Sequence, residues 1–408
     1  MMDSGRMGGS VLESTLRHLM QHAAAAPAVA ATTSGHVRVA SDIGGTFTDV
    51  VLERGAERWT AKVLTTPRAP EQAVMTGIAQ ALAKASIEPS EIGLHLHGTT
   101  LATNSIIEKR GAVTALLTTK GFRDIVDIGY ESRYDQYDLQ IEKKPPLTPR
   151  SLRFVAAQRH TARGEELTPL DEDGVRALAP LLREAGVQSI AISFFHSYAN
   201  SSHEQRAREL LLSLLPELAV TLSCEVCPEI REYERTTTAI ANAYVQPLMA
   251  SYLERLESGL LGAGFGCPTL LMTSGGGLTT VANARKFPIR LVESGPAGGA
   301  VFAASLARQM GLAKAISFDM GGTTAKICLL QDGQPSTARE FEVDRSARFA
   351  KGSVRSHMHA HTATAHHPHA DRIRYLSIYL SVYLSICLSV YLSICLSVYL
   401  YGMSTVAR

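Results

Sequence analysis

The stretch Asp42-Ile43-Gly44-Gly45-Thr46-Phe47-Thr48-Asp49 lies between two apolar runs, residues 36–40 and 50–52. This pattern predicts a strand, a glycine turn and a second strand. Adjacent glycines let backbone N–H groups approach an anion closely, and a tight turn needs backbone angles that glycine tolerates best. The threonine hydroxyls add donors, and the two aspartates offer hard oxygens suited to Mg²⁺. The stretch therefore indicates a phosphate-binding hairpin.

A second hairpin of the same kind is predicted far along the chain. The stretch Asp319-Met320-Gly321-Gly322-Thr323-Thr324-Ala325-Lys326 follows the apolar run 315–318 and precedes the run 327–330. A single Asp-x-Gly-Gly-Thr hairpin is usually just a turn whose aspartate caps its own backbone. Two copies in one chain favour two half-sites that close on one polyphosphate.

Composition narrows the class of protein. A chain of 408 residues with 45% hydrophobic and 19% charged residues fits a globular protein with two or more domains. A net charge of +2 gives no case for nucleic acid or an anionic membrane surface as partner. Six scattered cysteines favour a reducing compartment, and we expect the cytoplasm. The pair Cys224 and Cys227 lacks a second pair for metal binding, so buried or incidental thiols are favoured.

Between the two hairpins the sequence alternates between strand and helix patterns. Helical spacing marks residues 69–86, 171–185, 203–215 and 230–244, the last of these broken at Pro247, and a helix around Ile106 that ends at Gly111. Nearly continuous apolar strands mark residues 92–96, 113–118, 189–195 and 218–222. Apolar strands between amphipathic helices predict an α/β fold with parallel or mixed sheets covered on both faces.

Two further glycine-rich turns follow predicted strands, at residues 273–277 and 293–299, and the second opens a helix over 300–310. Such a turn can hold an anion at a helix N-terminus, or it can allow close packing of strand and helix. Neither turn matches the P-loop or the G-x-G-x-x-G fingerprint, and neither G-x-S-x-G nor H-E-x-x-H occurs in the chain.

Both ends of the chain differ in composition from its middle. Residues 1–35 are rich in Ala, Ser and Gly, which favours a disordered leader. Residues 357–369 hold six of the 14 histidines but lack acidic or cysteine partners for a metal. Residues 375–401 repeat Tyr/Cys-Leu-Ser-Ile/Val with period four, the product of a TATC tetranucleotide repeat translated in frame. An uncharged run longer than about 20 residues could also span a membrane, but its alternation fits a strand better. We interpret 354–408 as a non-native tail and expect no genuine membrane segment.

Together with its flanking motifs, the chain resembles the hydantoinase A / 5-oxoprolinase family, in particular N-methylhydantoinase A-like and acetophenone-carboxylase-like members. The resemblance covers about residues 37–353 and ends abruptly there. Besides the two hairpins, the motifs that carry it are residues 97–104 (HGTTLATN), 118–124 (TTKGFRD), 231–236 (REYERT) and 294–299 (SGPAGG).

The resemblance implies a two-domain α/β fold of the actin, sugar-kinase and heat-shock-ATPase type, which is ribonuclease H-like. Residues 36–225 would form the N-terminal domain and residues 226–353 the start of a truncated, incomplete ATPase domain. It also implies ATP-dependent opening of a cyclic amide, a hydantoin or 5-oxoproline as in glutathione metabolism, through phosphorylation of the amide oxygen. Alternatives are a ketone carboxylase subunit, an inactive truncated product and a nucleotide-binding module without enzyme activity. A hydantoinase B-type subunit or a homo-oligomer is the implied partner.

The resemblance also places ATP and Mg²⁺ on the two hairpins. Asp42 and Asp319 would hold Mg²⁺ directly or through water and count as catalytic, with Asp49 as a further metal ligand. Lys326 stands where some family members place an acid. The residues expected to contact phosphate are Gly44, Gly45, Thr46, Thr48, Gly321, Gly322, Thr323 and Thr324.

Other polar motifs leave two interpretations each. His97 and residues 99–104 could touch the ligand, or His97 could be a hydrogen-bonded, half-buried histidine. Arg123 and Asp124 could bind substrate or pair on the surface. A third group is predicted to form a charged helix face, namely Arg231, Glu232, Glu234 and Arg235.

Overall fold

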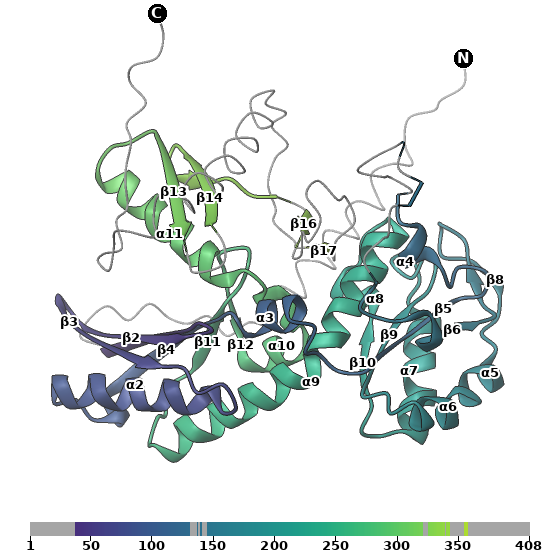
Figure 1. Cartoon of the computed structure of the whole chain (residues 1–408), viewed down its shortest axis with the longest axis horizontal. Helices are drawn as coiled ribbons and strands as arrows, with labels where there is room; N and C mark the ends of the chain where they lie inside the picture. Colours follow the sequence, from purple (N-terminus) through teal and green to yellow (C-terminus); the bar gives the residue numbers. More distant parts are fainter. Residues whose placement is uncertain are drawn as a thin grey trace, which may run out of the picture. The chain divides into compact units, whose positions relative to one another are not determined.

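The computed structural model describes residues 37–130, 137, 139–140, 145–320, 325–338, 340–342 and 355–357 (Figure 1). The chain divides into the units Met1–His36 and Val37–Arg408, and all described residues belong to the second. The predicted leader 1–35 and nearly all of the predicted tail 354–408 lie outside the described residues. So do four residues of the second hairpin, Gly321, Gly322, Thr323 and Thr324.

The first hairpin belongs to a six-stranded mixed sheet in the order β12-β11-β4-β1-β2-β3. The strands β1, β2 and β3 form an antiparallel meander, while β4 and β11 run parallel to β1. The predicted strand, glycine turn and strand are thereby confirmed. The strands are β1 (Val37–Ile43), β2 (Phe47–Arg54), β3 (Glu57–Leu64), β4 (Ile92–Thr99), β11 (Thr269–Met272) and β12 (Leu278–Thr280).

Two helices cover one face of this sheet, on its lower side in Figure 1. The helix α2 (Pro70–Ala85) packs against β2 and β3, as its apolar spacing predicts. A Cβ on Gly77 would lie 2.7 Å from Val50 Cγ2, so this glycine lets helix and strand approach closely. The helix α9 (Glu232–Gly262) contacts α2 and continues to the second sheet.

The second sheet has four parallel strands in the order β10-β9-β5-β6. Every residue of β5 and of β9 is buried, which agrees with their continuous apolar pattern. A short hairpin of β7 (Arg159–His160) and β8 (Glu166–Thr168) follows β6. The strands are β5 (Thr114–Thr119), β6 (Arg153–Ala156), β9 (Ser189–Ser193) and β10 (Ala219–Leu222), and the helices α3 (Leu101–Ile107), α4 (Ile125–Ile128), α5 (Glu172–Arg176), α6 (Leu178–Glu184), α7 (Ser202–Leu214) and α8 (Ser223–Val226).

A third sheet carries the second hairpin. Its strands β13 (Lys314–Met320), β14 (Ala325–Gln331) and β15 (Gln334–Pro335) form an antiparallel meander, the same order as β1–β2–β3. The helix α11 (Ser294–Gln309) packs on β13 and buries a row of alanines. The remaining elements are α10 (Val281–Lys286), the 3₁₀ turns η1 (Pro89–Glu91), η2 (Arg150–Leu152) and η3 (Pro288–Leu291), and the paired strands β16 (Glu340–Glu342) and β17 (Arg355–His357).

The prediction that the long helix breaks at Pro247 is wrong, because α9 runs through this proline. An interior proline removes a backbone donor and costs about 3 kcal/mol. The helix buries Val245 and Met249 completely on either side of it. This burial of apolar side chains, each contributing about 1.5–3 kcal/mol, offsets the local cost.

Two other helix predictions need correction. Residues 171–185 form two helices, α5 and α6, because Pro180 has no N–H to bond a carbonyl of the preceding turn. Gly186 ends this segment in the left-handed region, as predicted. Gly111 does not end α3, which stops at Ile107. A Cβ on Gly111 would lie 2.2 Å from Tyr244 Cε1, so this glycine makes room for an aromatic ring.

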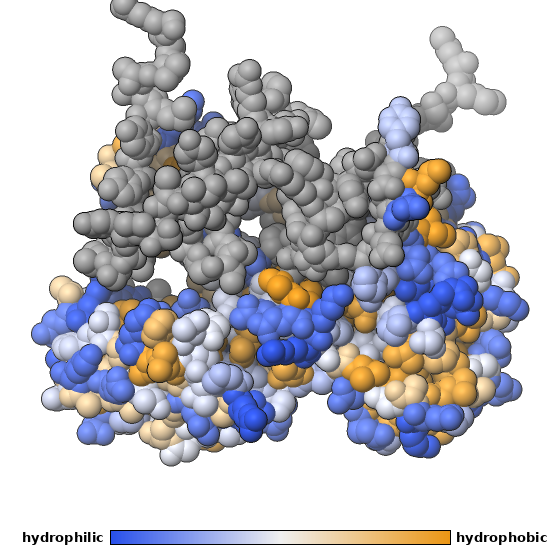
Figure 2. Space-filling view, viewed as in Figure 1, coloured by the Kyte–Doolittle hydropathy of each residue, from blue (hydrophilic) through white to orange (hydrophobic). Residues whose placement is uncertain are grey.

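The architecture is a mixed α/β fold with parallel sheets, as predicted. Hydrophilic side chains are interspersed with small hydrophobic patches on the face shown in Figure 2. Among the helices that the structure describes, none combines the length and apolarity needed to cross a bilayer.

Candidate functional site

The first glycine turn is held in place by the end of β3. The Gly44 N–H donates to the carbonyl oxygen of Phe47 at 2.9 Å, and the Thr65 N–H donates to the carbonyl oxygen of Thr46 at 2.9 Å. The Thr65 hydroxyl also donates to the carbonyl oxygen of Gly44 at 3.0 Å. Gly45 and Thr46 themselves remain exposed at the tip. The turn is therefore rigid and presents its tip to solvent, as a phosphate-binding loop requires.

Asp42 lies beside Gly98 in the parallel pairing of β1 with β4. A Cβ on Gly98 would lie 2.6 Å from Asp42 Oδ1. Because glycine has no side chain, the Asp42 carboxylate can occupy this space. This role of Gly98 was not predicted from sequence. A glycine inside a strand can mark such a close approach, but the partner depends on the register between strands.

Carboxylates from both hairpins act electrostatically on Asp42. Asp42 stands opposite Asp49 in the pairing of β1 with β2. Although Asp42 keeps contact with solvent, the protein atoms around its carboxylate raise its pKa, and the charges of Asp49 and Asp319 raise it further. Asp319 comes from β13 in the second hairpin. The charges of the other two aspartates predicted as metal ligands thus act on Asp42, and their joint role in binding a metal stays a prediction.

The chemistry of these carboxylates is compatible with a divalent cation. Like charges close together raise the pKa of a carboxyl group, and a bound cation offsets that repulsion. Hard carboxylate oxygens are ligands that Mg²⁺ prefers. Lys62 Nζ balances part of the charge, because it lies 2.9 Å from Asp49 Oδ1 and 3.0 Å from Oδ2. Asp42, Asp49 and Asp319 therefore each offer carboxylate oxygens of the kind that Mg²⁺ prefers.

The start of α3 borders the same turn. The Thr100 N–H and hydroxyl both donate to the carbonyl oxygen of Ile43, at 3.0 and 3.2 Å. A Cβ on Gly45 would lie 3.4 Å from Asn104 Nδ2, which places this amide beside the exposed glycine. Asn104 therefore joins the candidate site, within the segment 99–104 whose contact with ligand was one of two interpretations.

Thr48, also predicted to contact phosphate, lies on the face of the sheet opposite to that of its neighbour Asp49. Its side chain is fully buried and its hydroxyl lies 3.0 Å from the hydroxyl of Thr65. Thr48 therefore supports the hairpin from inside.

The second hairpin forms an ion pair with the residue that precedes α11. Lys326, opposite Asp319 in the pairing of β13 with β14, forms an ion pair with Glu293. The Glu293 N–H donates to Thr103 Oγ1 at 3.1 Å, and the Ser294 hydroxyl donates to the carbonyl oxygen of Thr99 at 3.3 Å. The glycine-rich segment 293–299, predicted as a turn after a strand, instead follows the 3₁₀ turn η3 and forms the start of α11. It is fixed to β4 and α3, which supports the packing interpretation.

His97 is a buried structural residue. Its Nδ1 lies 2.8 Å from Ser41 Oγ and its Nε2 lies 2.8 Å from the Tyr252 hydroxyl. Burial lowers its pKa to about 3, with a smaller effect from the neighbouring His95, whose own pKa burial lowers to about 4. Both imidazoles are therefore neutral near pH 7. The interpretation of His97 as a hydrogen-bonded histidine is supported, with complete rather than half burial.

Arg123 and Asp124 lie on the surface. Asp124 accepts hydrogen bonds from Arg150 at 2.9 and 3.1 Å, and this interaction lowers the pKa of Asp124. Arg123 lies 4.0 Å from Asp124. Surface pairing accounts for both residues.

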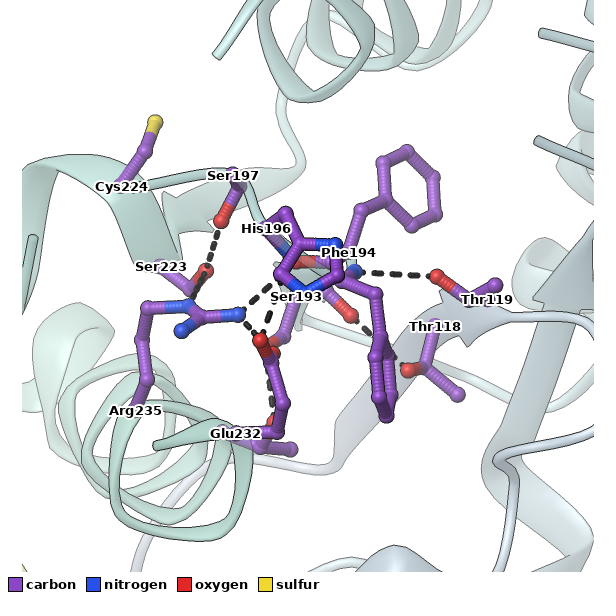
Figure 3. Close-up of polar contacts among 12 residues, drawn as sticks. Thr118, Thr119, Ser193, Phe194, His196, Ser197, Ser223, Cys224, Glu232 and Arg235 are labelled. Atoms are coloured by element: carbon purple, nitrogen blue, oxygen red, sulfur yellow. Dashed lines mark hydrogen bonds and ion pairs between the residues drawn. The ribbon is translucent and has the colours of Figure 1, made fainter. Parts of the chain in front are cut away.

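The prediction of a charged helix face at the start of α9 is wrong for Arg235. Its side chain is fully buried and donates to the carbonyl oxygens of Phe194 and Glu229 at 3.0 and 2.9 Å, and it pairs with Glu232 (Figure 3). Glu234 is buried as well. The helix begins at the carboxyl edge of the second sheet, so its polar side chains bind the ends of β9 and α8. Only Arg231, with a side chain 63% exposed, behaves as predicted.

A buried carboxylate completes this cluster. Glu204 accepts hydrogen bonds from the Phe194 N–H at 2.8 Å, the Ser223 hydroxyl at 2.6 Å and the Cys224 N–H at 2.9 Å. Burial raises the pKa of the Cys224 thiol, and it raises that of Cys227 to about 12. These thiols stay protonated at neutral pH, in agreement with the favoured interpretation.

Comparisons with known proteins give consistent matches. Residues 38–215 match the model of the hydantoinase/oxoprolinase N-terminal region, and residues 235–364 match the hydantoinase/oxoprolinase model. An uncharacterized protein of Methanocaldococcus jannaschii is 39% identical over 78% of this chain and 47% of its own length. The acetophenone carboxylase gamma subunit of Aromatoleum aromaticum is 30% identical over 71% of this chain and 42% of its own.

The caprolactamase subunit alpha of Pseudomonas jessenii is 36% identical over 75% of this chain and 45% of its own length. In the crystal structure of that ATP-dependent caprolactamase, the matched chain superposes with a TM-score of 0.64 over 72% of this chain and 43% of its own. The present chain therefore spans less than half the length of these relatives.

Proposed function

The chain belongs to the hydantoinase/oxoprolinase family, and from this premise we propose that it provides the ATP-binding part of an enzyme that opens a cyclic amide. The substrate would be of the hydantoin or 5-oxoproline type. One observation carries the proposal: Asp42 of the first hairpin lies within electrostatic range of Asp319 of the second. Two hairpins that share one cation site are suited to hold one polyphosphate between them.

The chemistry explains why ATP is needed. A ring amide resists hydrolysis because resonance weakens its carbonyl as an electrophile and its nitrogen as a leaving group. Transfer of a phosphoryl group from ATP to the amide oxygen gives an imidate that water attacks. The protein's task in phosphoryl transfer is to position the groups and neutralise charge.

In this proposal the residues of the two hairpins have different roles. Asp42, Asp49 and Asp319 would hold Mg²⁺, which supplies positive charge to the phosphates. The exposed N–H groups at the tip, with Gly45 and Thr46, would bind phosphate oxygens, and the Asn104 amide lies close enough to join them. Gly321, Gly322, Thr323 and Thr324 would do the same from the second hairpin.

The order of strands supports the ribonuclease H-like, actin-type part of the proposal. A three-stranded antiparallel meander followed by parallel strands on the β1 side occurs in the first sheet, and the meander recurs in β13–β14–β15. Two such halves that face each other would form a nucleotide cleft with one hairpin on each side.

A ketone carboxylase subunit is the second candidate function, favoured by the likeness to the acetophenone carboxylase gamma subunit. The same phosphoryl transfer would then activate an enolate or bicarbonate. The relatives named as subunits also support a partner subunit for this chain, of the hydantoinase B type.

Thermal unfolding of the full chain with and without Mg-ATP tests the proposal. A ligand at about 100 times its Kd stabilises the fold by about 2.7 kcal/mol, so the Tm rises. Gly45→Val should abolish this rise, because the added side chain covers the exposed tip. Gly266→Val is the matched control, since Gly266 is also exposed and has open space around it. A folded wild-type chain without any rise would refute the proposal.

A further inference from the structure

A cluster of two histidines and a glutamate lies beyond the carboxyl edge of the second sheet, away from the hairpin site. His160 stands opposite Glu166 in the β7–β8 hairpin, and His203 is the second residue of α7. Nitrogen and oxygen atoms of the three side chains all lie within 4.8 Å of one another. The carboxyl edge of a parallel sheet is where α/β folds commonly bind ligands.

His160 is unusual in this cluster because its ring has no polar partner. The side chain is only 1% exposed, and neither ring nitrogen has a hydrogen-bond partner among the described residues. A buried polar group without a partner costs free energy, so native structures commonly satisfy it with a side chain, a water molecule or an ion. Burial and the neighbouring His203 lower the pKa of His160, which keeps the imidazole in the neutral form that metals bind.

His203 is held by a fixed amide. Gln158 donates from Nε2 to Thr119 Oγ1, which also accepts from the Phe195 N–H at 3.0 Å. The Gln158 Oε1 faces His203 Nδ1 at 3.1 Å, and in the tautomer with the proton on Nδ1 this nitrogen donates to the amide oxygen. On the other side of the ring, Nε2 lies 2.9 Å from Glu166 Oε2. In that tautomer Nε2 and the carboxylate oxygen are both acceptors, and a cation between them, a proton or a metal ion, would stabilise the pair.

We propose that His160, His203 Nε2 and Glu166 Oε2 form a site for a divalent transition metal of the Zn²⁺ class. Two imidazoles and one carboxylate are a donor set that Zn²⁺ favours, and three protein ligands leave a fourth position for water. Gln158 does not bind the metal itself but orients the ring of His203 through Nδ1.

The site would connect the β7–β8 hairpin to the start of α7. The rings of His160 and His203 stack with centroids 4.0 Å apart, and coordination exchanges this contact for a bond from His160 to the metal. Glu166 opens the site to solvent, because its side chain is 54% exposed. A metal can therefore enter from the surface and reach the buried histidine.

Histidine side chains are metal ligands and six of them lie at 357–369, so the test compares variants of the full chain that share this tail. Zn²⁺ is titrated by calorimetry into the nucleotide-free wild type, Glu166→Gln and Glu165→Gln. Glu165 is the matched control, because it is the exposed neighbour of Glu166 and lies outside the cluster. Glu166→Gln should lose one Zn²⁺ equivalent or bind it at least tenfold more weakly, whereas Glu165→Gln should match the wild type.

Two further variants sharpen the result. His160→Ala should lose the same equivalent, and Gln158→Ala should weaken it by about 10- to 100-fold, as is usual for residues that orient a metal ligand. Should His160→Ala fail to fold, Glu166→Gln still decides, because its side chain is exposed. Equal stoichiometry and affinity in wild type and Glu166→Gln, or an equal loss in Glu165→Gln, would overturn the proposal.

Discussion

The carboxylate of Asp42 occupies the space above Gly98, where a Cβ atom would lie 2.6 Å from Oδ1 and 3.3 Å from Cγ. Gly98 thus determines the position of Asp42, although it offers no side chain of its own. Asp42 in turn is the member of the three-carboxylate cluster whose pKa the other two raise. The strand β4 therefore contributes to the proposed Mg²⁺ site by leaving room.

Gly98→Ala should weaken Mg-ATP binding at least tenfold while costing only about 1 kcal/mol of stability. The new methyl group contacts the end of a side chain that can rotate away, so the cost lies at the low end for overpacking. Rotation nonetheless removes the carboxylate from its place. Calorimetric titration and urea unfolding measure the two effects, with Gly266→Ala as control. Unchanged Mg-ATP affinity would show that the position of Asp42 is irrelevant to binding.

Asp42→Asn should stabilise the metal-free chain at neutral pH. The folded pKa of Asp42 is raised above 3.8, so the folded state disfavours the charged form. This penalty is present above the raised pKa and disappears as pH falls toward 3.8. The gain from Asp42→Asn, measured by urea unfolding, should therefore shrink on acidification. Asp49→Asn is the contrasting variant. It leaves Lys62 without its carboxylate partner, so it should not raise the free energy of unfolding. A pH-independent gain at position 42 would contradict the like-charge cluster.

The hairpins, the parallel strands and most helices could be predicted from sequence, because glycine turns and hydrophobic periodicity act over short distances. The course of α9 through Pro247 could not, because the local cost of proline is offset by packing that involves distant residues. The same limit applies to Arg235. Its charge indicates a solvent-exposed helix face, yet carbonyl oxygens at the end of β9 bind it in the interior.

The candidate site likewise contains residues that the sequence indicates and residues that only the structure reveals. The aspartates and glycines of the hairpins could be identified because they recur as a motif. Gly98 needed the register of β4 against β1, and Asn104 needed the fold of α3 beside the turn. The cluster of His160, Glu166 and His203 has no sequence spacing typical of a metal site, since a helix and a hairpin assemble it.

Stability should fall steeply as the pH drops below 6.5, because of His95 and His97. Their folded pKa values of about 4 and about 3 lie below the ordinary value of 6.5, so the unfolded chain takes up protons first. The stability they contribute is complete above pH 6.5 and is lost toward pH 3. Each histidine adds a slope on the order of 1 kcal/mol per pH unit. His95→Gln should remove about half of that slope in denaturant titrations between pH 6.5 and 4.5. An unchanged slope would contradict this assignment.

Tyr252→Phe should cost about 1–3 kcal/mol, because it leaves His97 Nε2 buried without its partner at 2.8 Å. Tyr244→Phe on the same helix is the control. Its hydroxyl makes no hydrogen bond within the described part of the chain, so its removal should change stability by less than about 0.5 kcal/mol. Equal effects of the two substitutions, measured by thermal unfolding, would argue against the network of Ser41, His97 and Tyr252.

Arg235→Met should cost about 3–5 kcal/mol, the range for removing one partner of a buried charge cluster. The guanidinium is fully buried and the charge of Glu204 acts on it, so its loss leaves that carboxylate uncompensated. Arg163→Met is the control and should stay within about 0.5 kcal/mol, because Arg163 is exposed. Adding Glu204→Gln to Arg235→Met should recover part of the loss, since the uncompensated charge is then absent. Fully additive effects in this double-mutant cycle, measured by urea unfolding, would show that the two side chains are not coupled.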